Sequence, residues 1–109
     1  MTSPTSEPDC WGTVVWFTPE QGGRRSGPPR PVTPERGYAA NGWLPPLDAS
    51  SGLRSLVLVD FEPGAWRSAA RAHWLVPSTD YPPVRPGSVL VVSEGPRAVA
   101  VLFVDGVEG

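Results

Sequence analysis

Residues 88–104 read SVLVVSEGPRAVAVLFV, and this stretch decides the fold. Its two halves, Ser88–Ser93 and Arg97–Val104, are rich in valine and other apolar residues that favour strands. Between them stand Glu94, Gly95 and Pro96, a run that is typical of a tight turn. Two strand-like runs joined by so short a turn predict an antiparallel hairpin.

The same arrangement recurs upstream, where short apolar runs end at proline or glycine. We expect strands at Thr13–Thr18, Tyr38–Leu44 and Ser55–Phe61, the last one ending at the Glu62-Pro63-Gly64 turn. Five or six strands at even spacing, with no helix predicted, indicate an all-β domain. The residues alone leave an antiparallel barrel and a sandwich open.

The segment Trp66–Val76 is ambiguous by local pattern. Its alanines favour helix, and Trp66, Ala69, Ala70 and His73 stand at helical spacing. With a period of two, Trp66, Ala70 and Trp74 share one face instead. Short strands with Pro-Gly turns on both sides favour the strand.

A chain of 109 residues is long enough for one domain, which buries roughly two-thirds of its unfolded surface. The 15 prolines and 12 glycines mostly separate the apolar runs, as turns require. They are dense in residues 1–10 and around Pro28–Pro34, and we expect both stretches to be flexible. The sequence therefore predicts a flexible tail at 1–10 and one domain at 11–109, with a long Pro/Gly-rich loop at 19–37.

The charge pattern excludes several functions. All nine positive residues are arginine, so the lysine that a GxxxxGK[ST] phosphate-binding loop requires is absent. A net charge of −2 argues against strong nonspecific binding to nucleic acid. No signal peptide is visible in Met1–Asp9, and the longest apolar run, Val99–Val104, is of strand length. We expect a cytoplasmic protein with no membrane partner.

Catalytic and metal sites are not predicted. Cys10, the single cysteine, excludes an internal disulfide, and with His73 it forms the only candidate pair for nucleophilic catalysis. We expect Cys10 at the edge of the tail, so this pairing is incidental. Zinc requires three or four ligands at fixed spacing, and Asp60 with Glu62 fits a solvated strand end better than an acid–base pair. We therefore expect no enzyme, no metal and no cofactor.

The Gly22-Gly23-Arg24-Arg25 loop is the main candidate for a binding site. Glycines permit positive φ, and guanidinium groups grip phosphate or carboxylate with two parallel hydrogen bonds. Alternatively, the glycines make a tight turn and Arg24 forms an ion pair within the barrel. These two interpretations are equally supported. Further candidates for a positive strip are on later strands: Arg67, Arg71 and Arg97, whose alternative is an ordinary solvated face.

The five tryptophans divide between core and surface. We expect at least three of them in the core, because a small barrel needs large interior side chains. Trp43 stands beside Gly42 and Pro45-Pro46, where exposure is easiest. It is the tryptophan that we expect to contact a partner.

Several segments, taken in order, resemble one protein family. Val14–Arg25 (VVWFTPEQGGRR) is similar to the first strand and Gly-Gly-Arg loop of the third, C-terminal domain of elongation factor Tu. Asp60–Gly64 resembles that domain's strand end and Pro-Gly turn, and Trp66–Pro77 its next strand. Pro86–Val104, which ends in SEGPRAVAVLFV, resembles its final hairpin, with an acidic-Gly-x-Arg turn. The similarity extends over nearly all of the chain after Cys10.

The resemblance implies a closed six-stranded antiparallel barrel in which Trp66–Val76 is a strand. It also implies that the Gly-Gly-Arg loop lies near the stem of a bound tRNA, with Arg24 and Arg25 as the residues that carry over. The chain departs from the family at Pro28–Glu35, which is longer, and after Gly37-Tyr38, where Ala39-Ala40-Asn41 follows. It lacks the nucleotide-binding domain and the second barrel, so we expect no nucleotide partner and no GTP hydrolysis.

We expect a non-catalytic module that recognises another protein, for example an accessory protein or an immunity-like protein that blocks a toxin. The alternative is binding of tRNA or another RNA backbone through the Gly-Gly-Arg-Arg loop. A contiguous surface of arginines favours RNA, whereas mixed charge with exposed tryptophan favours protein.

Overall fold

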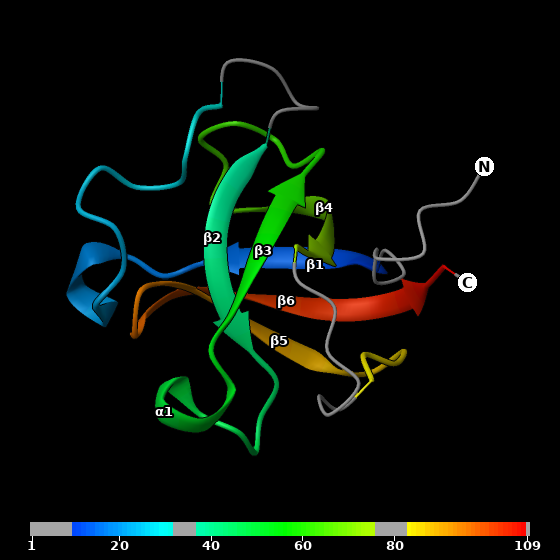
Figure 1. The fold of residues 1–109 in the computed structure, drawn as a ribbon. Helices are drawn as coiled ribbons and strands as arrows, with labels where there is room; N and C mark the ends of the chain where they lie inside the picture. Colours follow the sequence, from blue (N-terminus) through cyan, green and yellow to red (C-terminus); the bar gives the residue numbers. More distant parts are fainter. Residues whose placement is uncertain (1–9, 32–36, 76–82, 109) are drawn as a thin grey trace.

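One antiparallel sheet closes on itself in the computed structural model of the chain, which describes residues 10–31, 37–75 and 83–108 (Figure 1). The neighbours around the barrel are β1-β4-β3-β2-β5-β6, and β6 pairs with β1 to complete the circle. The closed six-stranded antiparallel barrel is thus confirmed. The strands are β1 (Cys10–Trp16), β2 (Tyr38–Trp43), β3 (Arg54–Val59), β4 (Arg67–Trp74), β5 (Val89–Glu94) and β6 (Arg97–Val107).

The ambiguous segment after Trp66 is a strand. β4 pairs with β1 on one side and with β3 on the other, so its backbone groups are used in two ladders. Ala70, Ala72 and Trp74 point into the barrel and are buried. Pairing on both sides outweighs the weak helix preference of the alanines.

Parts of the two segments expected to be flexible are packed against the barrel where the structure describes them. Cys10 is the first residue of β1 and only 3% exposed, because it pairs with Ala72 of β4 and Val107 of β6. Pro28 and Pro29 are buried, and the carbonyl of Pro29 accepts a hydrogen bond from the amide of Gly64 at 3.1 Å. The remainder of the predicted tail (1–9) and residues 32–36 of the loop lie outside the described residues.

Two single-turn helices occur where the sequence predicted none. The 3-10 helix η1 (Pro19–Gln21) begins at Thr18, whose hydroxyl accepts from the amide of Gln21. The α-helix α1 (Ala49–Gly52) lies between β2 and β3 (Figure 1). It begins at Asp48, whose carboxylate accepts hydrogen bonds from the amides of Ser50 and Ser51. Hydrogen bonds from the hydroxyls and amides of these serines lower the pKa of Asp48. In the described residues no helix is long and apolar enough to cross a membrane.

The core lies inside the barrel and consists mostly of aliphatic side chains. Inward positions alternate along the strands except beside the bulge of β5. The hydrophobic residues with 0% exposure are Val14, Leu56, Leu58, Val92, Val99, Ala100 and Leu102. Trp16 and Trp74 are the tryptophans of the core, so the expectation of at least three is wrong. Trp43 is half-buried, while Trp11 and Trp66 are 38% and 45% exposed. Leu and Val fill the narrow interior, which leaves the other indoles on outward or turn positions.

The barrel closes at a close approach between β1 and β6. A β-bulge lies between Trp11 and Gly12, and a Cβ atom at Gly12 would overlap the carbonyl oxygen of Phe103 on β6. Because that obstacle is backbone, no side-chain rotation relieves it. Only glycine fits this position without moving the β1–β6 ladder.

Gly12→Ala is therefore expected to lower the free energy of unfolding by about 2–3 kcal/mol, the cost of overpacking a tight site. The matched control is Gly95→Asn, because the φ of Gly95 is +60°, which asparagine tolerates, and a Cβ there meets nothing within 4 Å. Urea unfolding followed by tryptophan fluorescence measures both variants. Equal stability of the Gly12→Ala variant and the wild type would contradict the close approach.

Candidate functional site

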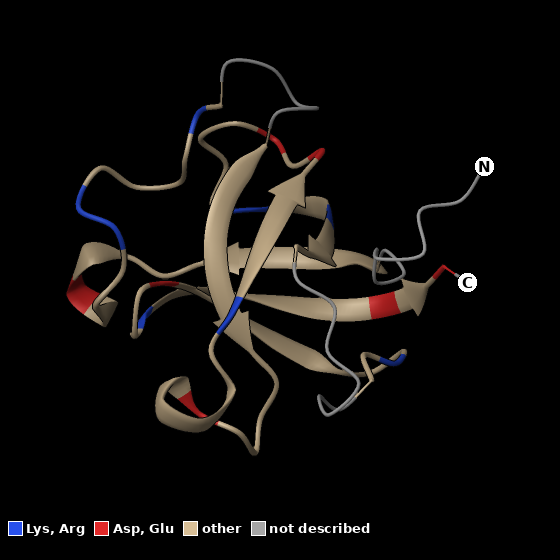
Figure 2. Cartoon of the chain, viewed as in Figure 1, with Lys and Arg blue, Asp and Glu red and all other residues tan. Residues whose placement is uncertain are grey.

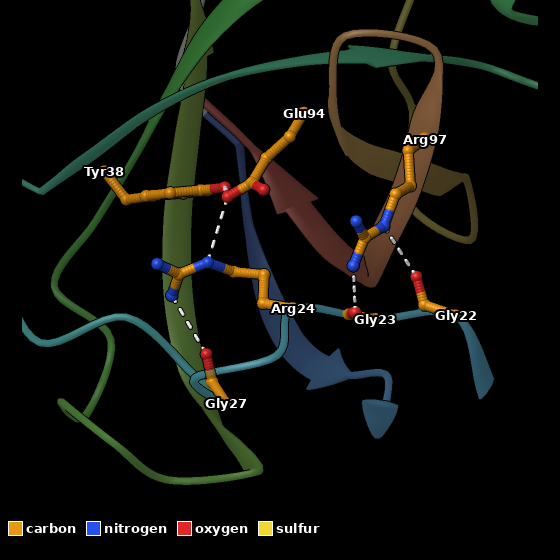
Figure 3. Close-up of polar contacts among 7 residues, drawn as sticks. All are labelled: Gly22, Gly23, Arg24, Gly27, Tyr38, Glu94 and Arg97. Atoms are coloured by element: carbon orange, nitrogen blue, oxygen red, sulfur yellow. Dashed lines mark hydrogen bonds and ion pairs between the residues drawn. The ribbon is translucent and has the colours of Figure 1, made fainter. Parts of the chain in front are cut away.

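The Gly-Gly-Arg-Arg loop is fastened to the β5–β6 turn. The Arg97 guanidinium donates from Nε to the carbonyl of Gly22 at 2.9 Å and from Nη2 to the carbonyl of Gly23 (Figure 3). Arg97 is the first residue of β6 and pairs with Glu94, the last residue of β5. The arginine of the hairpin thus holds the backbone of a loop more than 70 positions earlier in the chain.

The same turn holds Arg24 through its acidic residue. Arg24 Nε lies 2.9 Å from Glu94 Oε2, and Arg24 Nη1 donates to the carbonyl of Gly27 at 2.9 Å (Figure 3). The Arg24 side chain is only 23% exposed. The ion pair that the structural interpretation of Arg24 predicted is thus present, between the loop and the β5–β6 turn. We call these contacts of Arg24 and Arg97 with the hairpin and the loop the loop clamp.

Tyr38, the first residue of β2, completes this network. Its hydroxyl donates to Glu94 Oε2, and the Arg24 guanidinium lies 5.4 Å from the centre of its ring. The ring also packs edge-on against Trp16, which joins the network to the core. Burial raises the pKa of Tyr38 well above its usual value, and the hydrogen bond to the Glu94 carboxylate raises the pKa further.

The backbone conformation of the loop requires glycine at both of its glycine positions. Gly22 ends η1 with a φ of +91°, a left-handed conformation that side chains disfavour. A Cβ at Gly23 would overlap the carbonyl oxygen of Phe17. Both positions therefore have a structural reason to be glycine, whatever the loop binds.

The pH dependence of folding tests the Tyr38 contact. Its raised pKa means that the fold favours the neutral phenol, so this stabilisation is complete below pH 10, the usual pKa, and is lost as the pH rises above it. We expect the wild type to lose stability more steeply between pH 10 and 12 than Tyr38→Phe. Urea midpoints at four pH values measure the difference. Parallel curves for the two proteins would show that Tyr38 titrates normally.

The predicted positive strip is not uniform. Arg67 and Arg71 do share the outer side of β4, but Arg71 forms an ion pair with Glu108 and lies 5.6 Å from the Trp11 ring. Arg25 and Arg67 are exposed. Figure 2 shows arginines in the loop after η1 and on β4, with acidic residues among them. The charge on this part of the surface is therefore mixed.

The outside of β5, β6 and β1 carries a surface that the sequence analysis missed. Val89 is paired with Phe103, Phe103 with Thr13, Val91 with Val101, and Val101 with Val15, so these side chains lie on one outward side. We call this surface, together with Trp11, the outer face. Phe103 is 47%, Trp11 38% and Val89 37% exposed. Trp43, the expected contact residue, is half-buried beside Val91 at its edge.

A sequence signal for the outer face existed. Val89–Val92 and Val99–Val104 are continuous apolar runs, whereas a strand with one solvated side alternates apolar and polar residues. Continuous runs predict apolar side chains on both sides of the sheet. The interior of the barrel accounts for the apolar side chains on only one of these two sides.

Cys10 and His73 lie on neighbouring strands, and both residues line one small cavity. Cys10 pairs with Ala72 and shares its inward side, and its thiol donates to the carbonyl of Ala72 at 3.6 Å. His73 follows Ala72, so strand alternation directs its side chain to the opposite side of the sheet. Within the described ranges, no three His, Cys, Asp or Glu side chains cluster in a way that holds a metal ion.

The chain matches no model of a known protein family and no curated protein.

Proposed function

We propose that the protein is a non-catalytic module that binds another protein through the outer face. The observation that carries this proposal is the exposure of Phe103, Trp11 and Val89 on three neighbouring strands. A closed barrel has no free strand edge that a partner strand could cover. The exposed apolar side chains of the outer face therefore need another explanation. Contiguous exposed apolar surface is typical of sites where proteins associate.

The composition of the outer face suits protein recognition. Aromatic residues dominate the binding energy of protein interfaces, and burying one such side chain is worth ~1.5–3 kcal/mol. The margin is polar and carries charges of both signs. Arg67 on β4 is paired with Val15 on β1, and Asp105 on β6 is exposed. An apolar centre within a polar margin is the usual composition of an interface. An accessory protein and an immunity-like inhibitor both fit this description.

We also propose that the barrel is related to the third domain of elongation factor Tu. Two features support this: the closed six-stranded antiparallel arrangement, and the coupling of the Gly-Gly-Arg loop to the acidic-Gly-x-Arg turn. The segments of the resemblance thus contact one another in three dimensions.

A photo-crosslinking amino acid at position 103 tests the outer face. In extracts of the source cells it is expected to link one protein, and the same amino acid at Ser50 on α1 is not. The linked protein is then purified, and Phe103→Asp should weaken its binding at least about 30-fold, as loss of a central aromatic contact does. Phe103 points outward, so its variant should unfold at the wild-type temperature. Unchanged affinity in Phe103→Asp contradicts the proposal.

RNA binding through the Gly-Gly-Arg-Arg loop has less support, because the guanidiniums of Arg24 and Arg97 are engaged in the loop clamp. Only Arg25 of the loop presents an exposed charge. Fluorescence anisotropy of labelled bulk tRNA at low and moderate salt is expected to show no binding. Binding that falls steeply with salt and is lost in Arg25→Ala would establish the RNA function instead. Arg25→Ala is preferable to Arg24→Ala because it leaves the loop clamp intact.

A further inference from the structure

A second surface lies where β1 ends and β4 begins. The Trp66 indole packs over Gly27, whose Cβ would lie 3.6 Å from the ring, and the Trp66 carbonyl accepts the amide of Trp16. The Arg30 guanidinium lies against Gly64. These contacts join the loop after η1 to the turn before β4, two segments that are far apart in the sequence.

Three exposed arginines belong to the segments that meet at this indole. Arg67 follows Trp66 directly, Arg25 stands two positions before Gly27, and Arg30 reaches Gly64, two positions before Trp66. All three are exposed, and Trp66 is 45% exposed. We call Arg25, Arg30, Trp66 and Arg67 the arginine patch.

The arginine patch differs from Arg24 and Arg71 in its pairing. Arg24 and Arg71 each form an ion pair, with Glu94 and Glu108. Across the residues that the structure describes, none of the three arginines of the patch has an acidic partner within ion-pair distance. Among the described residues, three charges of one sign therefore lie on the segments that meet at this ring without forming an ion pair.

We propose that the arginine patch binds an acidic segment of a protein partner, with carboxylates on the guanidiniums and an apolar side chain on the Trp66 ring. The inference rests on the proposed function, since it specifies the chemistry of the bound protein. A guanidinium presents paired donors that match a carboxylate, and an indole offers a flat apolar surface beside them. Charge complementarity thus specifies an acidic occupant, and the exposed indole specifies one with an apolar residue.

The acidic residues near the patch favour a protein segment over a nucleic-acid strand. Glu62 precedes the Pro63-Gly64 turn, Asp60 follows β3 directly and Glu20 lies on η1, and all three are exposed. A nucleic-acid backbone carries a charge at every residue and is repelled wherever it passes a carboxylate. An acidic peptide can direct a few carboxylates to the arginines and leave neutral residues beside the glutamates. The net charge of −2 acts in the same direction.

Two-dimensional ¹⁵N NMR of the whole protein tests this proposal. The indole signal of Trp66 is assigned with Trp66→Phe, and the protein is titrated with a pentapeptide that has glutamates on both sides of one phenylalanine. We expect saturable shifts of that indole and of the amides of Arg25, Arg30 and Arg67, and no such shifts with the glutamine analogue of the peptide. The triple variant Arg25→Gln/Arg30→Gln/Arg67→Gln should weaken binding about tenfold or more.

The matched control is Arg85→Gln, which removes one exposed positive charge from the segment before β5. It should bind the peptide as the wild type does. Equal weakening by Arg85→Gln would show that net charge alone attracts the peptide, and shifts confined to the outer face would place the acidic segment elsewhere. Tighter binding of an oligouridylate of equal charge would assign the patch to RNA. Each of these three results overturns the inference, and the crosslinking at position 103 tests the proposed function independently.

Discussion

The structure depends on the pairing of β1 with β6 at Gly12. Without a side chain there, the backbone of β1 approaches the Phe103 carbonyl closely enough to complete the barrel. This closure makes β1 a shared strand, paired with β4 on one side and β6 on the other. It seals Val14 and Leu102 inside and leaves Trp11 and Phe103 outside. The core and the outer face are therefore two consequences of one backbone contact.

Closure also explains why several arginines are structural. It brings the β5–β6 turn next to the loop after η1, so Glu94 meets Arg24 and Arg97 meets the carbonyls of the two glycines. Each of these groups would otherwise be solvated, and together they hold a loop that has little regular structure. An arginine whose guanidinium already binds groups of its own chain is less available to bind a partner. The binding candidates are therefore the arginines that the loop clamp leaves out.

The two proposed surfaces are continuous. Val15 of the outer face is paired with Arg67 of the arginine patch, so the apolar side chains pass directly into the positive ones. A partner with an apolar centre and an acidic margin would cover both. Such a surface obtains specificity from the charges and binding energy from the aromatic residues. The mixed charge around Trp66 is consistent with this and unlike the uniformly positive track that RNA requires.

The sequence by itself determined the all-β class and the approximate position of every strand except β4, whose local pattern also fits a helix, because β-branched runs and Pro-Gly turns are local signals. With the resemblance it also predicted the closed six-stranded barrel. It did not determine that Cys10 belongs to β1, that two tryptophans rather than three fill the core, or that Arg24 forms an ion pair with Glu94. Those outcomes depend on register and closure, which join strands from opposite ends of the chain. A shift by one residue exchanges the two sides of a strand, and only the tertiary structure fixes which side faces water.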